Sequence, residues 1–162
     1  MKIKLIKKIN DSEIIKLIEL DKNLVDKYGV SFSNEVWNKD NFNYELPDKE
    51  KLSYACFVNN ELIGYIVSSI KNDSIYIHRF AVDKQGYARL FFEEILKFYS
   101  DEKIFLMVNI INEKAISFYK SFNFHIVDNS LIIDKFIADG LKIKNTEILI
   151  GENYKCYLMK RD

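Results

Sequence analysis

The chain has 162 residues and equal numbers of basic and acidic residues, 24 of each, so its formal net charge is zero. This length is typical of one domain, and we predict a single domain over residues 1–162. A neutral chain argues against a nucleic-acid partner, because such proteins carry a basic excess on one face. No apolar run approaches the ~18 residues of a membrane span, so we expect no membrane partner and a cytoplasmic location.

Cysteine and glycine are both scarce in this sequence. Cys56 and Cys156 lie far apart in apolar, strand-like segments, and their spacing is not that of metal ligands. We therefore predict two reduced, buried thiols and no metal site. The five glycines are widely separated, so any phosphate-binding loop has to be built around a single glycine.

The first third of the chain predicts one strand and two helices. Residues 2–5 alternate polar and apolar side chains, as a strand does. Asn10 and Glu13 have the spacing of a helix-capping box, and apolar residues follow at helical spacing over 14–20. The apolar spacing over 32–37 predicts a second, shorter helix.

From residue 52 onward, strand patterns and helix patterns follow one another. The predicted strands are 52–58, 62–70, 75–82, 104–108 and 124–127, and the predicted helices are 87–99 and 112–122. Asn59 and Asn60 form a turn pair that tolerates positive φ between the first two of these strands. This order predicts a mixed α/β domain with a central sheet.

The tail over residues 128–153 has the weakest pattern. We predict a short helix over 132–137, capped by Ser130 and ended by Gly140. Strands are predicted over 148–150 and 154–159. The tail could cover a neighbouring subunit or a substrate pocket.

The segment from Phe80 to Arg89 places a short loop between a strand and an amphipathic helix. A helix N-terminus offers unpaired N–H groups and the positive end of a dipole, and therefore favours anions. Gly86 would let the backbone approach a phosphate closely, and Arg89 would add a cation. The alternative is that Gly86 is only a turn residue and Arg89 a solvated charge.

Asn112, Ala115 and Tyr119 recur on one face of the next predicted helix. Asn112 is suited to the N-cap, and the small Ala115 leaves room beside Tyr119. A phenol whose pKa lies near 10 is a suitable general acid toward a departing thiolate. The alternative is that Tyr119 is an ordinary half-buried aromatic residue.

Together these two segments resemble the GNAT superfamily of N-acetyltransferases. The family's cofactor loop reads Gln/Arg-x-x-Gly-x-Gly/Ala. Aligned from Gln85, the chain matches only the first position of this motif. Aligned from Asp83, it matches the last two specified positions, at Gly86 and Ala88. The family's second motif, Asn-x-x-Ala-x-x-x-Tyr, matches the three residues described above. Asn123-Phe124 stands where that motif continues with Gly-Phe. The resemblance covers roughly residues 1–127 and the last strand.

The resemblance implies a GNAT-like α/β fold, with a mixed, mostly antiparallel central sheet flanked by helices on both faces. It implies direct transfer of an acetyl group from acetyl-CoA, as co-substrate, to an amine. The pantetheine arm would lie between the strands that end near Val82 and Val108, pairing with backbone like an added strand. A backbone N–H within 80–82 would stabilise the oxyanion, and Tyr119 would protonate the thiolate. The implied cofactor-binding residues are Phe80, Ala81, Val82, Gln85, Gly86, Tyr87, Ala88, Arg89, Asn112 and Ala115.

Several groups are candidates for the general base. His78 has a suitable intrinsic pKa, and strand alternation places it on one face with Phe80 and Val82. A structural histidine is the alternative. Glu35 and Glu45, in the region where the family usually places its acceptor, are further candidates, and so is water.

Residues 34–50 contain five acidic residues and two lysines, a balance that suits a cationic amine. The alternative is a solvated helix with a packed aromatic face. We predict a small-molecule amine as acceptor. The alternatives are a protein or peptide amine, and a non-catalytic GNAT-like domain that binds CoA weakly or not at all. The oligomeric state is open, with a homodimer as one candidate.

Overall fold

A seven-stranded sheet forms the centre of the protein in the computed structural model, which describes residues 1–33, 35–100, 102–127 and 155–162. The strands are β1 (Lys2–Leu5), β2 (Tyr54–Val58), β3 (Glu61–Lys71), β4 (Ser74–Val82), β5 (Ile104–Asn109), β6 (His125–Ile126) and β7 (Cys156–Arg161). Their order across the sheet is β1-β2-β3-β4-β5-β7-β6. All neighbours are antiparallel except β4 and β5, so the predicted mixed, mostly antiparallel sheet is confirmed.

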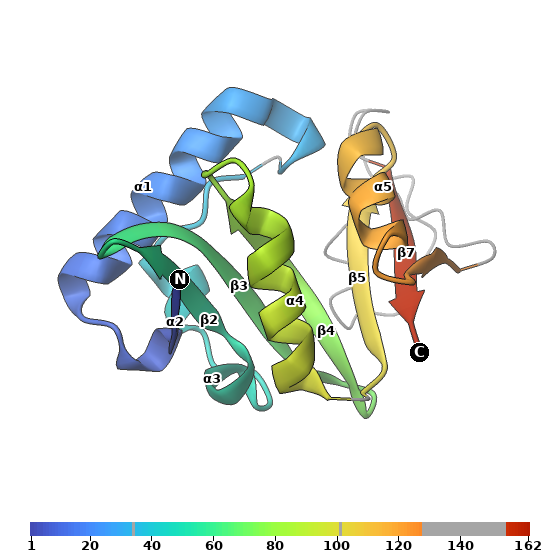
Figure 1. The fold of residues 1–162 in the computed structure, drawn as a ribbon, viewed down its shortest axis with the longest axis horizontal. Coiled ribbons are helices and arrows are strands. Elements are labelled where there is room, and N and C mark those ends of the chain that lie inside the picture. The colour runs from blue at the N-terminus through green and yellow to red at the C-terminus, as the bar shows by residue number, and fades with distance from the viewer. Residues whose placement is uncertain (34, 101, 128–154) are drawn as a thin grey trace.

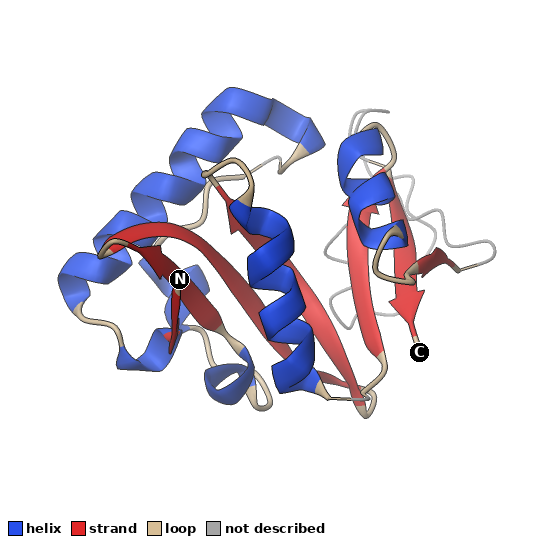
Figure 2. Ribbon diagram, in the orientation of Figure 1, coloured by secondary structure: helices blue, strands red, loops and turns tan. Residues whose placement is uncertain are grey.

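Helices cover both faces of this sheet (Figure 2). They are α1 (Asp11–Tyr28), α2 (Lys39–Asn43), α3 (Lys49–Leu52), α4 (Tyr87–Tyr99) and α5 (Glu113–Lys120), with 3-10 turns at Ile6–Lys8 and Gly29–Ser31. One core lies between the sheet and α4 and α5, and includes Phe91, Phe92 and Ile95. The other lies under α1 and α2. The two cysteines are buried in β2 and β7, as predicted.

The capping box at the start of α1 is confirmed. The Asn10 side chain accepts a hydrogen bond from the Glu13 N–H (2.9 Å), and the Glu13 carboxylate accepts one from the Asn10 N–H (3.0 Å). The helix predicted over 32–37 is wrong, because the helix of this region is α2, capped by Asn38. The helix predicted over 132–137 and the strand over 148–150 lie outside the described residues.

β4 and β5 pair over only three residues and then separate. Ile75–Ile77 pair with Ile104–Leu106, and no further pairing joins the two strands. Figure 1 shows them converging at the bottom of the view and diverging toward the top, with α4 and α5 on either side of the gap. Among the described residues no helix is long and apolar enough to span a membrane.

Gly64 allows β3 to lie close to the end of β4. A Cβ at this position would stand 2.7 Å from the carbonyl oxygen of Ala81 and 2.9 Å from a methyl group of Val82. Both contacts are shorter than packed atoms tolerate, and the nearer one is to backbone, which cannot rotate away. Only glycine therefore fits here without moving β4.

We expect Gly64→Ala to lower the free energy of unfolding by about 1–3 kcal/mol, because β4 has to shift to admit the methyl group. Thermal and denaturant unfolding measure the loss. Glu61→Ala, an exposed change on the same strand, is the control and should leave stability nearly unchanged. Equal stability of the two variants would contradict the close approach.

Candidate active site

The part of β4 beyond its pairing with β5 presents open backbone groups to the gap. The Asp83 N–H donates to the Ile63 carbonyl of the β3 side (2.8 Å). Because facing directions alternate along an antiparallel strand, the groups of Ala81 also face β3, whereas those of Phe80 and Val82 point toward the gap. Of the three predicted oxyanion donors, the N–H groups of Phe80 and Val82 therefore have the required direction.

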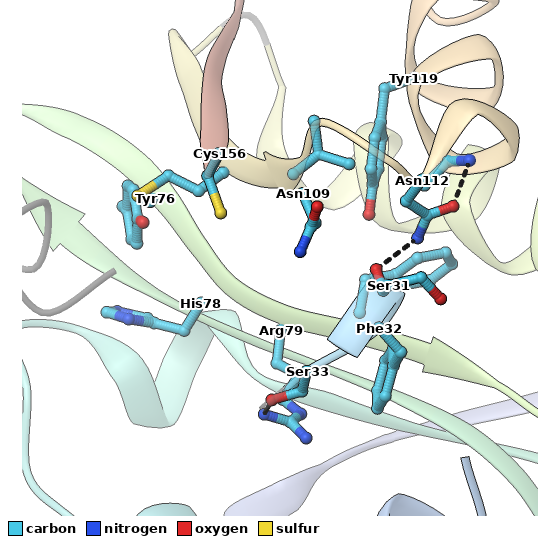
Figure 3. Close-up of a pocket in the computed structure, with 14 residues that line it drawn as sticks. Ser31, Phe32, Ser33, Tyr76, His78, Arg79, Asn109, Asn112, Tyr119 and Cys156 are labelled. Atoms are coloured by element: carbon cyan, nitrogen blue, oxygen red, sulfur yellow. Dashed lines mark hydrogen bonds between the residues drawn. The ribbon is translucent and has the colours of Figure 1, made fainter. Parts of the chain in front are cut away.

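Tyr119 of α5 faces this gap from the opposite side. The side chain is only 9% exposed, and its ring packs against those of Phe92 and Phe124. Figure 3 shows its hydroxyl pointing into a pocket, and no hydrogen bond joins that hydroxyl to another described residue. Burial raises the pKa of the phenol well above its usual value, so the hydroxyl keeps its proton at neutral pH.

Asn112 places α5 and thereby Tyr119. Its side-chain oxygen accepts from the Ala115 N–H (3.0 Å) and caps the helix, as predicted. Its side-chain N–H₂ group donates to the carbonyl of Ser31 (2.9 Å), which follows α1 (Figure 3). This second bond crosses the gap. Both ends of the amide are therefore used within the protein.

Two cavities meet at Tyr119. The first, called the arm groove here, is lined by six of the predicted cofactor residues: Phe80, Ala81, Val82, Ala88, Asn112 and Ala115. The second, called the inner pocket, lies between the separated strands (Figure 3). Its other lining residues include His78 of β4, Asn109 of β5 and Cys156 of β7. Tyr119 lines both cavities, so a molecule in either reaches its side chain.

The other predicted cofactor residues, Gln85, Gly86, Tyr87 and Arg89, lie at and beside the start of α4 and do not line the arm groove. Gly86 has φ +86°, in the left-handed region that favours glycine, and a Cβ there would meet open space. The Tyr87 N–H donates to the Lys84 carbonyl (3.2 Å). The loop is thus a tight, exposed turn that ends in the N-terminus of α4.

Arg89 is engaged by the end of α5. Its guanidinium donates to the Ser121 hydroxyl (2.7 Å) and lies 4.7 Å from the ring centroid of Phe122. Glu93 stands one turn further along α4, 3.7 Å from the same guanidinium. The predicted phosphate-binding cation therefore also connects the two helices that flank the gap.

A β-bulge interrupts β4 next to the inner pocket. Val67 of β3 pairs with Arg79, but the next residue, Ser68, pairs with Ile77, which leaves His78 as the extra residue. An extra residue reverses the alternation of side chains beyond it. Sequence periodicity contains no signal for such an insertion.

The bulge makes the prediction that His78 shares a face with Phe80 and Val82 wrong. Phe80 and Val82 pack against the core beneath α4. The His78 imidazole instead lies against the ring of Tyr76 (4.9 Å between centroids), with Nε2 2.7 Å from the Ser69 hydroxyl. It lines the same pocket as Tyr119, although Figure 3 shows its ring pointing away from the Tyr119 hydroxyl.

Comparison with known proteins agrees with this geometry. An acetyltransferase (GNAT) domain model matches residues 17–140. The chain belongs to the GNAT acetyltransferase family. The family predicted from the two motifs is therefore confirmed. No curated protein matches the chain by sequence.

Solved structures of low sequence identity share the GNAT fold of this chain. Arabidopsis thaliana Naa50, in complex with the bisubstrate analogue CoA-Ac-MVNAL, is 19% identical with a TM-score of 0.67, over 99% of this chain and 97% of that one. The ribosomal-protein-S18-alanine N-acetyltransferase of Escherichia coli is 15% identical with a TM-score of 0.65, over 98% and 91%. A Bacillus subtilis acetyltransferase in complex with CoA is 18% identical with a TM-score of 0.57, over 99% and 97%.

The structure places two other candidate bases of this GNAT chain outside the inner pocket. Glu45, with Asp48 and Glu50, lines a separate pocket near the first 3-10 turn that shares no residue with the cavities at Tyr119. Burial lowers the pKa of Lys49 in that pocket to about 8. Glu35 is not among the residues that line the inner pocket. Much of the predicted acidic surface therefore lies away from Tyr119.

Sequence reasoning missed a buried ion pair beside the inner pocket. The Arg79 guanidinium donates from Nε and Nη2 to the two carboxylate oxygens of Asp21 (2.7 and 3.0 Å). The side chains are 4% and 0% exposed. A signal was present, because Asp21 falls among Leu17 and Leu24 on the apolar face of α1, where a carboxylate needs a buried partner.

We expect Asn112→Ala to lower the free energy of unfolding by about 1–2 kcal/mol, because the helix cap and the bond to Ser31 are both lost. Denaturant unfolding measures the loss. Lys114→Ala, an exposed change in the same turn of α5, is the control. If the two variants unfold alike, Asn112 does not hold α5 in place.

Proposed function

We propose that this GNAT chain transfers the acetyl group of acetyl-CoA directly to a primary amine at Tyr119. The observation that carries the proposal is the buried Tyr119 hydroxyl, which faces the gap where β4 has separated from β5 and bonds no other described residue. A proton donor and an open strand edge thus stand on opposite sides of one cavity. Acyl transfer from a thioester needs both.

The arm groove is suited to a pantetheine arm. Its walls are the end of β4, the start of α4, α5 with its N-cap, and the last turns of α1 with the turn that follows, and they are mostly apolar. The backbone groups of Phe80 and Val82 would pair with the amides of the arm as a neighbouring strand does. The solved relatives in complex with CoA and with a CoA bisubstrate analogue support this assignment.

The reaction follows from the groups on the two sides of the gap. A thioester carbonyl at the β4 edge accepts a hydrogen bond from the N–H of Phe80 or Val82, which stabilises the oxyanion formed when the amine attacks. The carbon–sulfur bond then breaks, and the Tyr119 hydroxyl gives its proton to the thiolate. Its raised pKa keeps that proton available at neutral pH.

His78 is the proposed group that takes the proton released by the amine. It lines the inner pocket, unlike Glu35 and Glu45, and it is held by Ser69. Because its ring points away from the Tyr119 hydroxyl in Figure 3, we expect a water molecule to relay the proton between the amine and the imidazole.

The acceptor amine enters the inner pocket in this proposal. A small-molecule amine was predicted from the acidic segment, most of which lies elsewhere. A peptide or protein amine is the second candidate, and a specific observation favours it: the solved relatives include one bound to CoA-Ac-MVNAL and one named for ribosomal protein S18. The cytoplasmic location and the homodimer remain predictions.

Calorimetric titration with acetyl-CoA tests the co-substrate. We expect micromolar affinity, in the range of 1–10 μM at about −8 to −7 kcal/mol, because the arm groove and loop are both formed. Adenosine diphosphate, which lacks the pantetheine arm, is the control and should bind more weakly. No heat and no thermal shift with acetyl-CoA would overturn the assignment.

We expect Tyr119→Phe to lower turnover by about 10²-fold with little change in acetyl-CoA affinity, because only the proton donor is removed. Thiol release with a panel of small amines and short peptides measures turnover and also identifies the acceptor class. The raised pKa predicts that Tyr119 causes no loss of wild-type turnover between pH 7 and about 10, since it stays protonated there. Unchanged turnover of the variant would remove Tyr119 from this role.

A further inference from the structure

The segment that follows α1 contributes its first residues to one side of the inner pocket, and we call residues 31–33 and 35–37 of this segment the acceptor wall. Ser31, Phe32 and Ser33 line the inner pocket. Beyond the short turn at Gly29–Ser31 the wall has no helix or strand. The Phe32 N–H and the Ser33 N–H donate to the Gly29 carbonyl (3.0 and 3.1 Å), and side chains make further bonds to the rest of the wall.

Arg79 and Asp21 supply those side-chain bonds. Arg79 donates from Nη1 to the Ser33 hydroxyl (2.9 Å) and from Nη2 to the Glu35 carbonyl (3.0 Å). Asp21 accepts from the Trp37 N–H (2.7 Å). The pair that joins α1 to β4 therefore also holds the wall at three successive points.

Aromatic rings complete the enclosure of this ion pair. The Arg79 guanidinium carbon lies 4.8 Å from the ring centroids of both Phe32 and Trp37. The Tyr65 hydroxyl of β3 donates to Asp21, which is fully buried. A guanidinium can bind a carboxylate through two atoms and still donate elsewhere, which lysine cannot do.

The wall is linked in turn to Tyr119. Its first residue, Ser31, accepts the Asn112 bond that crosses the gap, and Asn112 caps the helix that carries Tyr119. We propose that Asp21 and Arg79 are positioning residues that hold the acceptor wall against Tyr119 and so determine how the amine is bound. The proposal rests on the function proposed above. Ser31 and Phe32 also line the arm groove, whereas Ser33 lines only the inner pocket of the two, so we expect amine binding to respond more than acetyl-CoA binding.

Arg79→Lys tests the proposal, because it keeps the charge but loses the forked contacts to the wall. We expect the KM for the amine to rise about tenfold and the Kd for acetyl-CoA to change less than about twofold. Trp37 is the only tryptophan of the chain and lies in the wall, so its fluorescence reports the wall directly. We expect its emission to shift to the red and its quenching by acrylamide to increase.

Tyr99→Phe is the matched control for a general loss of stability. The Tyr99 hydroxyl donates to the Leu52 carbonyl and accepts from the Ser68 hydroxyl (both 2.7 Å), in the other core and away from the wall. We expect it to lower the Tm while the KM and the Trp37 emission stay as in the wild type. Ser33→Ala is the second test if Arg79→Lys fails to fold. It removes the hydroxyl that bonds Arg79 and the Glu35 backbone but leaves the ion pair, and we expect a smaller shift of the same kind.

The outcomes separate this proposal from the proposed function. If folded Arg79→Lys and Ser33→Ala match Tyr99→Phe in amine KM and in Trp37 emission, the positioning proposal is overturned. If the wild type transfers acetyl to no amine, the proposed function fails, and the fluorescence comparison still decides whether the pair orders the wall. Unchanged Trp37 emission in both wall variants would overturn it on that readout alone.

Discussion

The parallel pairing of β4 with β5 stops after three residues, and the active-site geometry follows from that stop. Beyond it the backbone groups of Phe80 and Val82 face a gap instead of a neighbouring strand. A buried backbone group without a partner costs about 1–3 kcal/mol, so an edge of this kind favours a ligand that can pair with it. The arm groove beside this edge leaves room for such a ligand.

The buried ion pair anchors β4 to α1 close to the point where β4 separates from β5. Arg79 follows the bulged residue and turns toward α1, where Asp21 holds it through two bonds. Removing one partner of a buried pair costs about 3–5 kcal/mol, because the other charge is left without compensation. The strand is therefore held from the α1 side at the place where it loses its pairing with β5. The same pair fixes the acceptor wall, so strand position and pocket shape depend on one interaction.

Much of this architecture could be predicted from local pattern. The capping box at Asn10 and the N-cap at Asn112 depend on neighbouring residues alone, and both are present. The alternation over 75–82 predicts a strand correctly but cannot show an inserted residue, because the bulge at His78 arises from pairing with β3. The apolar residues over 32–37 have helical spacing for another reason: Phe32 and Trp37 enclose a guanidinium from a distant strand.

The structure shows why the predicted cofactor loop forms with a single glycine. Only Gly86 in that loop adopts a positive φ, so one glycine suffices to form the turn into α4. The remaining positions of the family's loop have side chains here, and Arg89 among them bonds Ser121 at the end of α5. Arg89 thus connects α4 to the end of α5 across the gap. Asn112 makes a second connection across it, from the start of α5 to the Ser31 carbonyl. The open edge of β4 and the Tyr119 hydroxyl lie at this gap, and we propose that the thioester and the amine meet there.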